Sequence, residues 1–240
     1  IKFIADNGYE MIITVDCGSV SAEEVAYAKE LGLAIVVTDH HNITDVMADC
    51  LLINPKRPGS KYPFTELSGC GVAFKIAQRL QKKAGLPKSV LTEVLDLVAI
   101  GTIGDVMPLL DENRTFVKFG LKVINTGQRY GLRKLMEGAK LNCGKVKSGN
   151  VGFVIVPHLN ASGRIEDASQ AVRLLLAEEG SAEAITIVKD LLAKNRERKR
   201  LQQETVDSCT RNLNQIDDFL LIRSGDAHEG IAGIAAGKIK

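Results

Sequence analysis

The sequence lacks the features that would assign it to several specialised classes of protein. No stretch approaches the roughly 20 consecutive apolar residues that a membrane-spanning helix needs. No two cysteines stand in a C-x-x-C spacing, and the total number of cysteines, five, is odd. We therefore expect reduced cysteines in a cytoplasmic protein, with no zinc site and no place in a membrane.

A strong excess of charge is also missing. The chain has 31 lysines and arginines against 29 aspartates and glutamates, which gives a net charge of +2. Any surface that binds nucleic acid must therefore be local, because the chain as a whole is nearly neutral. The 240 residues, of which 45% are hydrophobic and 25% charged, are enough for one large or two small globular domains. No internal repeat or low-complexity segment is present.

Two predicted strands end in side chains that can ligate a metal ion. The apolar run Leu33–Val37 predicts a strand buried on both faces, and the triplet Asp39-His40-His41 follows it. Asp16 follows the strand predicted at Met11–Val15 in the same way. Open α/β sheets bind ligands at the carboxyl ends of their strands, and carboxylates with imidazoles suit manganese, magnesium or iron. The alternative is that Asp16 caps the next helix and the histidines are ordinary surface groups.

The order of predicted elements indicates an α/β fold. Strand, helix and strand within about 30 residues form a βαβ unit, and residues 51–53 predict a third strand. We expect a parallel sheet with flanking helices, a helical subregion and a long interdomain helix at about 181–213. The other predicted helices lie at 71–83, 89–100, 116–124, 131–136, 167–176 and 230–239, with a strand at 219–222 and either helix or strand at 150–156.

Further candidate residues come from segments outside the predicted sheet. Asp105 lies in a turn marked by Gly101, Gly104 and Pro108, so it is either a helix cap or a third carboxylate for the metal site. Residues 160–164 (Asn-Ala-Ser-Gly-Arg) predict a small-residue loop whose arginine suits phosphate recognition. Most surface arginines, however, have no such role.

A basic cluster lies on the predicted long helix. It comprises Lys194, Arg196, Arg198, Lys199 and Arg200, interrupted only by Glu197. Such a cluster can follow a nucleic-acid backbone. A solvent-exposed helix face with local ion pairs explains it equally well.

With these residues identified, the chain resembles the DHH phosphoesterase superfamily, which is named for the triplet Asp39-His40-His41. Within it the chain is most similar to the RecJ family of bacterial single-stranded-DNA-specific 5′-to-3′ exonucleases. The likeness covers nearly the whole chain. Its matching segments follow the family's order and are Val15–Gly18, Thr38–His41, Gly69–Lys75, Gly101–Leu109 and Leu159–Arg164.

The resemblance implies a two-metal phosphodiesterase that hydrolyses single-stranded DNA from its 5′ end in DNA repair and recombination. Asp16 would bridge two Mn²⁺ or Mg²⁺ ions, with His40 and Asp105 as further ligands. Asp39 would orient His40, and His41 would contact the scissile phosphate. The DNA would be bound by Asn160, Arg164, Arg196, Arg198 and Arg200.

The resemblance also implies a division into domains. Residues 1–180 would form the DHH phosphoesterase domain, 181–213 the interdomain helix and 214–240 the start of a DHHA1-like domain. The family's first motif, an aspartate-rich strand end, has no match here. We therefore expect weak metal binding and little or no nuclease activity from this chain, and an altered backbone contact at His158, where the family commonly has arginine.

Two alternatives to the exonuclease are open. One is another DHH enzyme with the same metal residues: a pyrophosphatase, an oligoribonuclease or a cyclic-dinucleotide phosphodiesterase. The other is a non-catalytic DHH scaffold in replication, although the presence of Asp16, His40 and Asp105 argues against the loss of ligands. The expected partners are single-stranded DNA, and with it a single-strand-binding protein or a helicase; the protein itself is expected to be a monomer.

Overall fold

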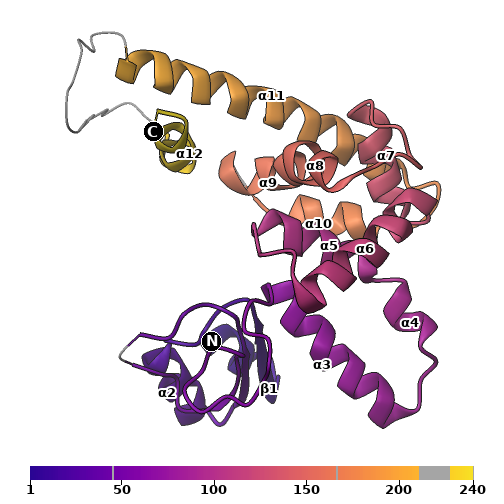
Figure 1. The fold of residues 1–240 in the computed structure, drawn as a ribbon. Helices are drawn as coiled ribbons and strands as arrows, with labels where there is room; N and C mark the ends of the chain where they lie inside the picture. Colours follow the sequence, from indigo (N-terminus) through magenta and orange to yellow (C-terminus); the bar gives the residue numbers. More distant parts are fainter. Residues whose placement is uncertain (45, 166, 211–227, 240) are drawn as a thin grey trace. The chain divides into compact units, whose positions relative to one another are not determined.

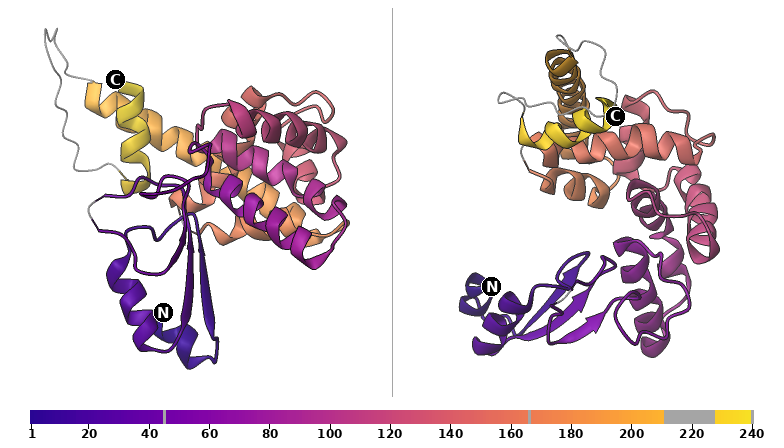
Figure 2. Two further views of the ribbon diagram at one scale, coloured as in Figure 1. Left: turned by 60° about the horizontal axis from the view of Figure 1, so that its bottom comes forward. Right: turned by 60° about the vertical axis from the view of Figure 1, so that its left-hand side comes forward.

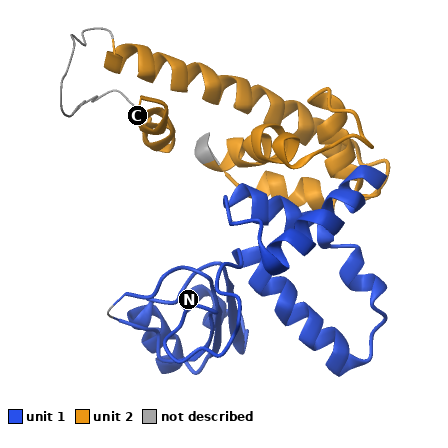
Figure 3. Ribbon diagram, in the orientation of Figure 1, with its two compact units in different colours: residues 1–126 blue, residues 127–240 orange. Residues whose placement is uncertain are grey.

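The chain divides into two compact units, residues 1–126 and residues 127–240 (Figure 3). The computed structural model describes residues 1–44, 46–165, 167–210 and 228–239, with the side chains of 164 and 165 excepted. Within these residues no helix combines the length and apolarity that crossing a bilayer requires. The boundary at 126/127 rests on compactness alone. The domain boundaries at 180 and 213 that the sequence suggests remain predictions.

The first unit contains a parallel three-stranded sheet of order β1-β2-β3 (Figures 1 and 2). The strands are β1 (Met11–Val15), β2 (Ala34–Thr38) and β3 (Leu51–Ile53). The last residues of all three strands are in register: Val15 pairs with Thr38, and Thr38 with Ile53. The predicted α/β fold is therefore confirmed. The central strand is buried only towards its carboxyl end, since Ala34 is exposed while Val37 and Thr38 are buried.

Helices pack against this sheet and extend the first unit. Its helices are α1 (Lys2–Asp6), α2 (Ala22–Glu30), α3 (Gly69–Ala84), α4 (Ser89–Thr92), α5 (Leu95–Gly104) and α6 (Asp111–Thr126). The hydroxyl of Ser68 caps α3 by accepting a hydrogen bond from the backbone N–H of Gly71 at 3.1 Å. The predicted helix at 89–100 is thus two helices, α4 and α5. A core of buried residues joins α3, α5 and α6 and comprises Leu67, Val72, Phe74, Val98 and Phe116.

The described part of the second unit is entirely helical. Its elements are α7 (Tyr130–Gly138), α8 (Ser148–Asn150), the π-helix η1 (Val151–Ile155), α9 (Val156–Ile165), α10 (Ser169–Leu176), α11 (Ala182–Thr210) and α12 (Glu229–Ile239). Fully buried Leu135, Leu174 and Leu191 come from α7, α10 and α11, so these three helices share one core. The long helix and the last helix were both predicted. The strand predicted at 219–222 lies outside the described residues.

The predicted loop at 160–164 is wrong, because α9 includes these residues. Pro157 follows directly after the first residue of α9. Helical geometry continues from α8 through η1 into α9, so Pro157 lies inside this run, directly after the π-helical turn. The sequence prediction treated Pro157 as the end of an element, whereas the helix continues through it.

Candidate metal centre

The ends of β1 and β2 bring together the first group of predicted site residues. Asp16 directly follows β1, and its backbone N–H donates to the carbonyl of Thr38 at 2.9 Å. Its φ of +69° is in the left-handed region, which a non-glycine residue seldom adopts. Such backbone strain concentrates at functional sites. The triplet Asp39-His40-His41 follows β2, the neighbouring strand.

His40 lies at the centre of this group. Its Nε2 is 3.0 Å from Oδ1 of Asp16 and 3.3 Å from Oδ2 of Asp105. Asp105 stands at the carboxyl end of α5, so a third element contributes to the site, as one of the two sequence readings proposed. The imidazole is buried, and its Nδ1 has no hydrogen-bond partner within the described structure. All polar contacts of this side chain are therefore made by Nε2 with two carboxylates.

This arrangement fits a divalent cation. Two ligands at right angles around an ion at about 2.1 Å are about 3 Å apart, which is the spacing between Nε2 of His40 and the two carboxylates. Ligand atoms of Asp16, His40 and His41 all lie within 4.8 Å of one another. Oxygen and imidazole nitrogen ligands are the set that Mn²⁺ accepts readily. The residues that are present can therefore hold such an ion.

The carboxylate of Asp39 contacts both histidines of the triplet. Its Oδ1 accepts a hydrogen bond from Nδ1 of His41 at 2.7 Å and from the backbone N–H groups of His40 and His41. Asp39 was expected to orient His40; it contacts the backbone N–H of that residue, and its ring contact is with His41. Nε2 of His41 is left as the free nitrogen of a largely exposed side chain.

These contacts shift two pKa values in opposite directions. Burial opposes ionisation of Asp39, but hydrogen bonds from His41 and Ser19 outweigh it and hold the pKa of this carboxyl well below its usual range. The hydrogen bond to Asp39 raises the pKa of His41, which desolvation only partly offsets. The pair is therefore stabilised with Asp39 ionised and His41 protonated.

Two residues that sequence reasoning missed, Ser19 and Asn54, hold this triplet through hydrogen bonds. The backbone N–H of Ser19 donates to Oδ2 of Asp39 at 3.0 Å. Asn54 directly follows β3, and its Nδ2 donates to Oγ of Ser19 and to the carbonyl of His41, both at 2.9 Å. Its Oδ1 accepts from the N–H of Lys56 at 2.8 Å, so this buried amide is satisfied at both ends. Its position at a third strand end was the one signal available in the sequence.

Gly69, at the start of α3, allows the carboxylate of Asp16 to lie where it does. A Cβ atom at position 69 would overlap Oδ1 and Cγ of Asp16. The glycine is therefore required for close approach, and the beginning of α3 limits the positions that the Asp16 side chain can adopt. Sequence reasoning used this segment only as part of a family likeness.

The remaining predicted site residues belong to the second unit. Asn160 is an exposed residue of α9, while the side chain of Arg164 lies outside the described residues. On α11, the guanidinium of Arg200 is 2.6 Å from Glu197 and 2.5 Å from Glu204, and Nε of Arg198 donates to Asn195 at 3.0 Å. Arg196 is exposed and forms no ion pair with another described residue. Much of the basic cluster is thus locally paired.

Comparison with known proteins places this site in a family. Residues 1–102 match the DHH family, N-terminal domain. This match includes Asp16 and the triplet Asp39-His40-His41 at the two strand ends and stops shortly before Asp105. Residues 1–102 therefore belong to the DHH family.

Within this family the chain is RecJ-like. It is 39% identical to the single-stranded-DNA-specific exonuclease RecJ of Bacillus subtilis, with 99% of this chain and 30% of that protein covered. It is 34% identical to RecJ of Escherichia coli, with 97% of this chain and 43% of that protein covered. The chain thus spans less than half the length of these relatives.

Solved structures show the same likeness. A crystal structure of exonuclease RecJ bound to manganese superposes with a TM-score of 0.86 at 31% identity, covering 100% of this chain and 61% of that one. RecJ from Thermus thermophilus in complex with Mn²⁺ gives a TM-score of 0.83, also at 31% identity, with 36% of its chain covered. The fold described above is therefore that of a RecJ core.

Proposed function

We propose that the protein is a metal-dependent phosphodiesterase that degrades single-stranded DNA from the 5′ end. The observation that carries the proposal is the position of His40, whose Nε2 lies 3.0 and 3.3 Å from the carboxylates of Asp16 and Asp105. The relatives named as RecJ support the choice of substrate. DNA repair and recombination are the processes in which such an activity is used.

Asp16, His40 and Asp105 would hold Mn²⁺ or Mg²⁺, with Asp16 as the ligand shared between two ions. The relatives solved with Mn²⁺ and with Mg²⁺ support this choice of metals. When bound, the ions supply Lewis-acid charge at the attacking and leaving oxygens of an in-line displacement. The left-handed backbone of Asp16 and the close approach of Gly69 orient the shared carboxylate before an ion binds.

His41 would contact the scissile phosphate. Its Nδ1 is occupied by Asp39 at 2.7 Å, which leaves Nε2 to donate a hydrogen bond to a phosphate oxygen. Asp39 is held by the N–H of Ser19, and Asn54 holds the carbonyl of His41, so the imidazole has little freedom to turn away. Fixed donors of this kind stabilise charge that develops in a transition state without having to reorganise.

Residues of the second unit would bind the DNA strand. Asn160 and Arg164 of α9 would contact phosphate, and Arg196, Arg198 and Arg200 of α11 would follow the backbone. Arg196 is the best placed of the last three, because it is exposed and unpaired within the described structure. Arg200 would contribute less, since Glu197 and Glu204 offset its charge.

The test measures Mn²⁺ binding and nuclease activity on the same preparations. Mn²⁺ is titrated into the chain by calorimetry, and release of nucleotides is followed from single strands labelled at the 5′ or the 3′ end. Asp16→Ala is expected to abolish both signals. Asp49→Ala is the matched control, because Asp49 is an exposed carboxylate of the same unit that pairs with Lys29 at 2.9 Å. It should leave both unchanged.

Several outcomes would contradict the proposal. Equal Mn²⁺ affinity in wild type and Asp16→Ala would remove the assigned metal site. Cleavage of pyrophosphate or dinucleotides in preference to long single strands would favour another DHH enzyme. No Mn²⁺ binding by the wild-type chain at any concentration tested would favour a non-catalytic scaffold.

We also infer that the protein acts as a monomer in the cytoplasm, alongside a single-strand-binding protein or a helicase. All five cysteines carry free thiols, which supports a reducing compartment. Light scattering on purified protein tests the oligomeric state. Affinity capture with the two candidate partners, in the presence of nuclease to remove bridging DNA, tests the association.

A further inference from the structure

The outer edge of β3 is open. Within the described residues, the sheet ends at this strand, which pairs only with β2. The carbonyl of Ile53 points towards β2, where it accepts from the N–H of Asp39 at 3.0 Å. Because backbone groups alternate along a strand, the N–H and C=O of Leu52 point to the other, unpaired side. An open edge of this kind can pair with a strand from another chain.

Two pockets lie along this edge and form what we call the β3 groove. One has a volume of about 400 Å³ and the other of about 290 Å³, and they share Leu51, Leu52 and Arg57 as lining residues. Much of the lining of the larger pocket is apolar. It includes Leu52, Ile53, Leu67, Val72 and Ile76. The groove therefore offers free backbone groups beside a site for apolar side chains.

Three cations and one carboxylate line the β3 groove. The cations are Arg57, Lys75 and Arg79, and the carboxylate, Asp49, is paired with Lys29 at 2.9 Å. Lys75 is neutralised by Glu112 at 2.6 Å. Arg57 and Arg79 also line the groove, are exposed, and have no side-chain partner among the described residues. Two uncompensated positive charges thus lie beside an apolar pocket.

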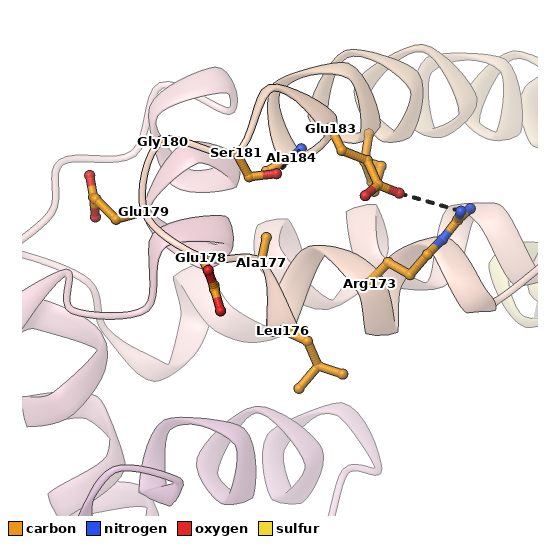
Figure 4. Close-up of a pocket in the computed structure, with 10 residues that line it drawn as sticks. Arg173, Leu176, Ala177, Glu178, Glu179, Gly180, Ser181, Glu183 and Ala184 are labelled. Atoms are coloured by element: carbon orange, nitrogen blue, oxygen red, sulfur yellow. Dashed lines mark hydrogen bonds and ion pairs between the residues drawn. The ribbon is translucent and has the colours of Figure 1, made fainter.

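A pocket in the second unit differs from the β3 groove in how its charged side chains are paired. It lies between α10 and α11, with a volume of about 480 Å³ (Figure 4). Its only cation, Arg173, is 3.4 Å from Glu183, and Glu179 on its rim is paired with Arg133. Its arginine is thus paired within the chain, so this pocket, unlike the β3 groove, offers no unpaired cation to an acidic ligand.

We propose that the β3 groove binds an extended acidic peptide segment with alternating apolar side chains, added to the sheet as a strand beside β3. The peptide backbone would pair with the N–H and C=O of Leu52. Its apolar side chains would enter the pocket above Ile76, and its carboxylates would face Arg57 and Arg79. This is strand addition, in which main-chain hydrogen bonds give affinity and side-chain pockets give specificity.

A peptide fits these features better than a nucleic acid does. The positive charge alone would suit either, because both carboxylates and phosphates are attracted to arginine. Only a peptide also supplies N–H and C=O groups at the spacing of a strand. The aromatic ring nearest the groove, Tyr62, has Lys75 6.0 Å from its centroid and bonds Glu112 through its hydroxyl at 2.6 Å, so it is already engaged.

The first test is fluorescence anisotropy with a labelled six-residue peptide that alternates aspartate and leucine. We expect the double variant Arg57→Glu/Arg79→Glu to bind this probe at least tenfold more weakly than wild type. The control is Lys82→Glu/Lys83→Glu, the same charge change at exposed positions of α3 that do not line the groove. It should change affinity by less than twofold. No binding to wild type, or equal losses in both variants, would overturn the proposal.

The second test separates strand pairing from simple charge attraction. Two further probes carry N-methyl groups on alternate backbone nitrogens, one set in each probe. Strand addition predicts that one methylated probe loses binding and the other keeps it, because only alternate N–H groups face β3. Equal binding by both would show that the backbone is not paired. Competition by single-stranded DNA, lost in the same double variant, would assign the groove to nucleic acid instead.

Discussion

The two units of the chain use charged side chains in different ways. In the first unit, Asp16, Asp39 and His40 follow strands, and each is fixed by backbone geometry or by hydrogen bonds that reach across the sheet. In the second unit, Arg198 and Arg200 lie on the surface of one helix and contact residues three or four positions away. Groups held by a sheet are positioned for chemistry, whereas groups on a helix surface can adapt to a flexible strand.

The largest difference between the units is expected for Asp16→Asn. Asparagine tolerates the left-handed backbone of this position, so the fold should survive while the negative charge of the proposed metal ligand is lost. Mn²⁺ affinity should fall by at least about 100-fold, beyond what loss of a supporting contact costs. Calorimetric titration measures it. Asp207→Asn, on α11 of the second unit, is the control and should have no effect.

Gly69→Ala should affect the site almost as strongly. The new Cβ would overlap the carboxylate of Asp16, which must then move away from His40. We expect Mn²⁺ affinity to fall by about 10- to 100-fold, as for other changes that displace a ligand. Gly149→Ala in the second unit is the matched control, because no atom lies within 4 Å of its Cβ position. Equal affinities in the two variants would contradict the steric account.

Asn54→Leu tests how much the hydrogen bonds of Asn54 contribute to the stability of the first unit. It leaves the buried hydroxyl of Ser19 and the carbonyl of His41 without their donor. Each unsatisfied group costs about 1–3 kcal/mol, so the free energy of unfolding should fall by about 2–4 kcal/mol. Urea denaturation monitored in the first unit measures this loss. The exposed Asn142→Leu in the second unit should change it by less than about 0.5 kcal/mol.

The Asp39–His41 pair should make stability depend on pH. The pKa of Asp39 is lowered in the folded state, so its contribution is present above about pH 4 and is lost on acidification. The pKa of His41 is raised, so its contribution is complete below its unfolded value of 6.5 and is lost as pH rises. His41→Ala should therefore destabilise more at pH 5.5 than at pH 8.5.

This pH effect should not exceed about 1 kcal/mol, because His41 is largely exposed and its ion pair is screened by solvent. Urea midpoints at the two pH values measure it. His228→Ala is the control, since His228 is an exposed histidine of the second unit. A larger destabilisation at pH 8.5 than at pH 5.5 would show that the pair does not carry the effect.

The smallest effects should distinguish arginines on α11. Arg196→Ala should weaken binding to single-stranded DNA in the nuclease-silent Asp16→Ala background and lower the salt slope by about 1. Arg200→Ala should change both less, because Glu197 and Glu204 already offset this charge. Anisotropy at several salt concentrations measures both quantities. The basic cluster would have no role in DNA binding if all of its single and combined variants kept the wild-type slope.

Sequence reasoning succeeded where a local pattern decides the structure. The apolar runs that form β1 and β2 set the strands, and the polar residues that follow them had to meet at one edge of the sheet. It failed at Pro157, because a proline usually ends a helix, whereas here the helical run continues through it after the π-helical turn η1.

Other parts of the site had no local signal. Asn54 and Ser19 are 35 residues apart in sequence, and the parallel registers of β1 with β2 and of β2 with β3 bring them together. Gly69 reads as an ordinary start of a helix until the position of the Asp16 carboxylate is known. Such residues act through neighbours in space, so a single sequence cannot identify them.

The contact between Gly69 and Asp16 has a consequence for how the site responds to its surroundings. The start of α3 restrains the carboxylate by excluded volume, without a hydrogen bond or an ion pair. Excluded volume does not titrate and is not screened by salt. This steric part of the restraint is therefore insensitive to acidity and ionic strength, whereas the contact of the carboxylate with His40 and its attraction for a cation are not. Changes in the medium should alter how often the site is filled while leaving this steric limit on its shape the same.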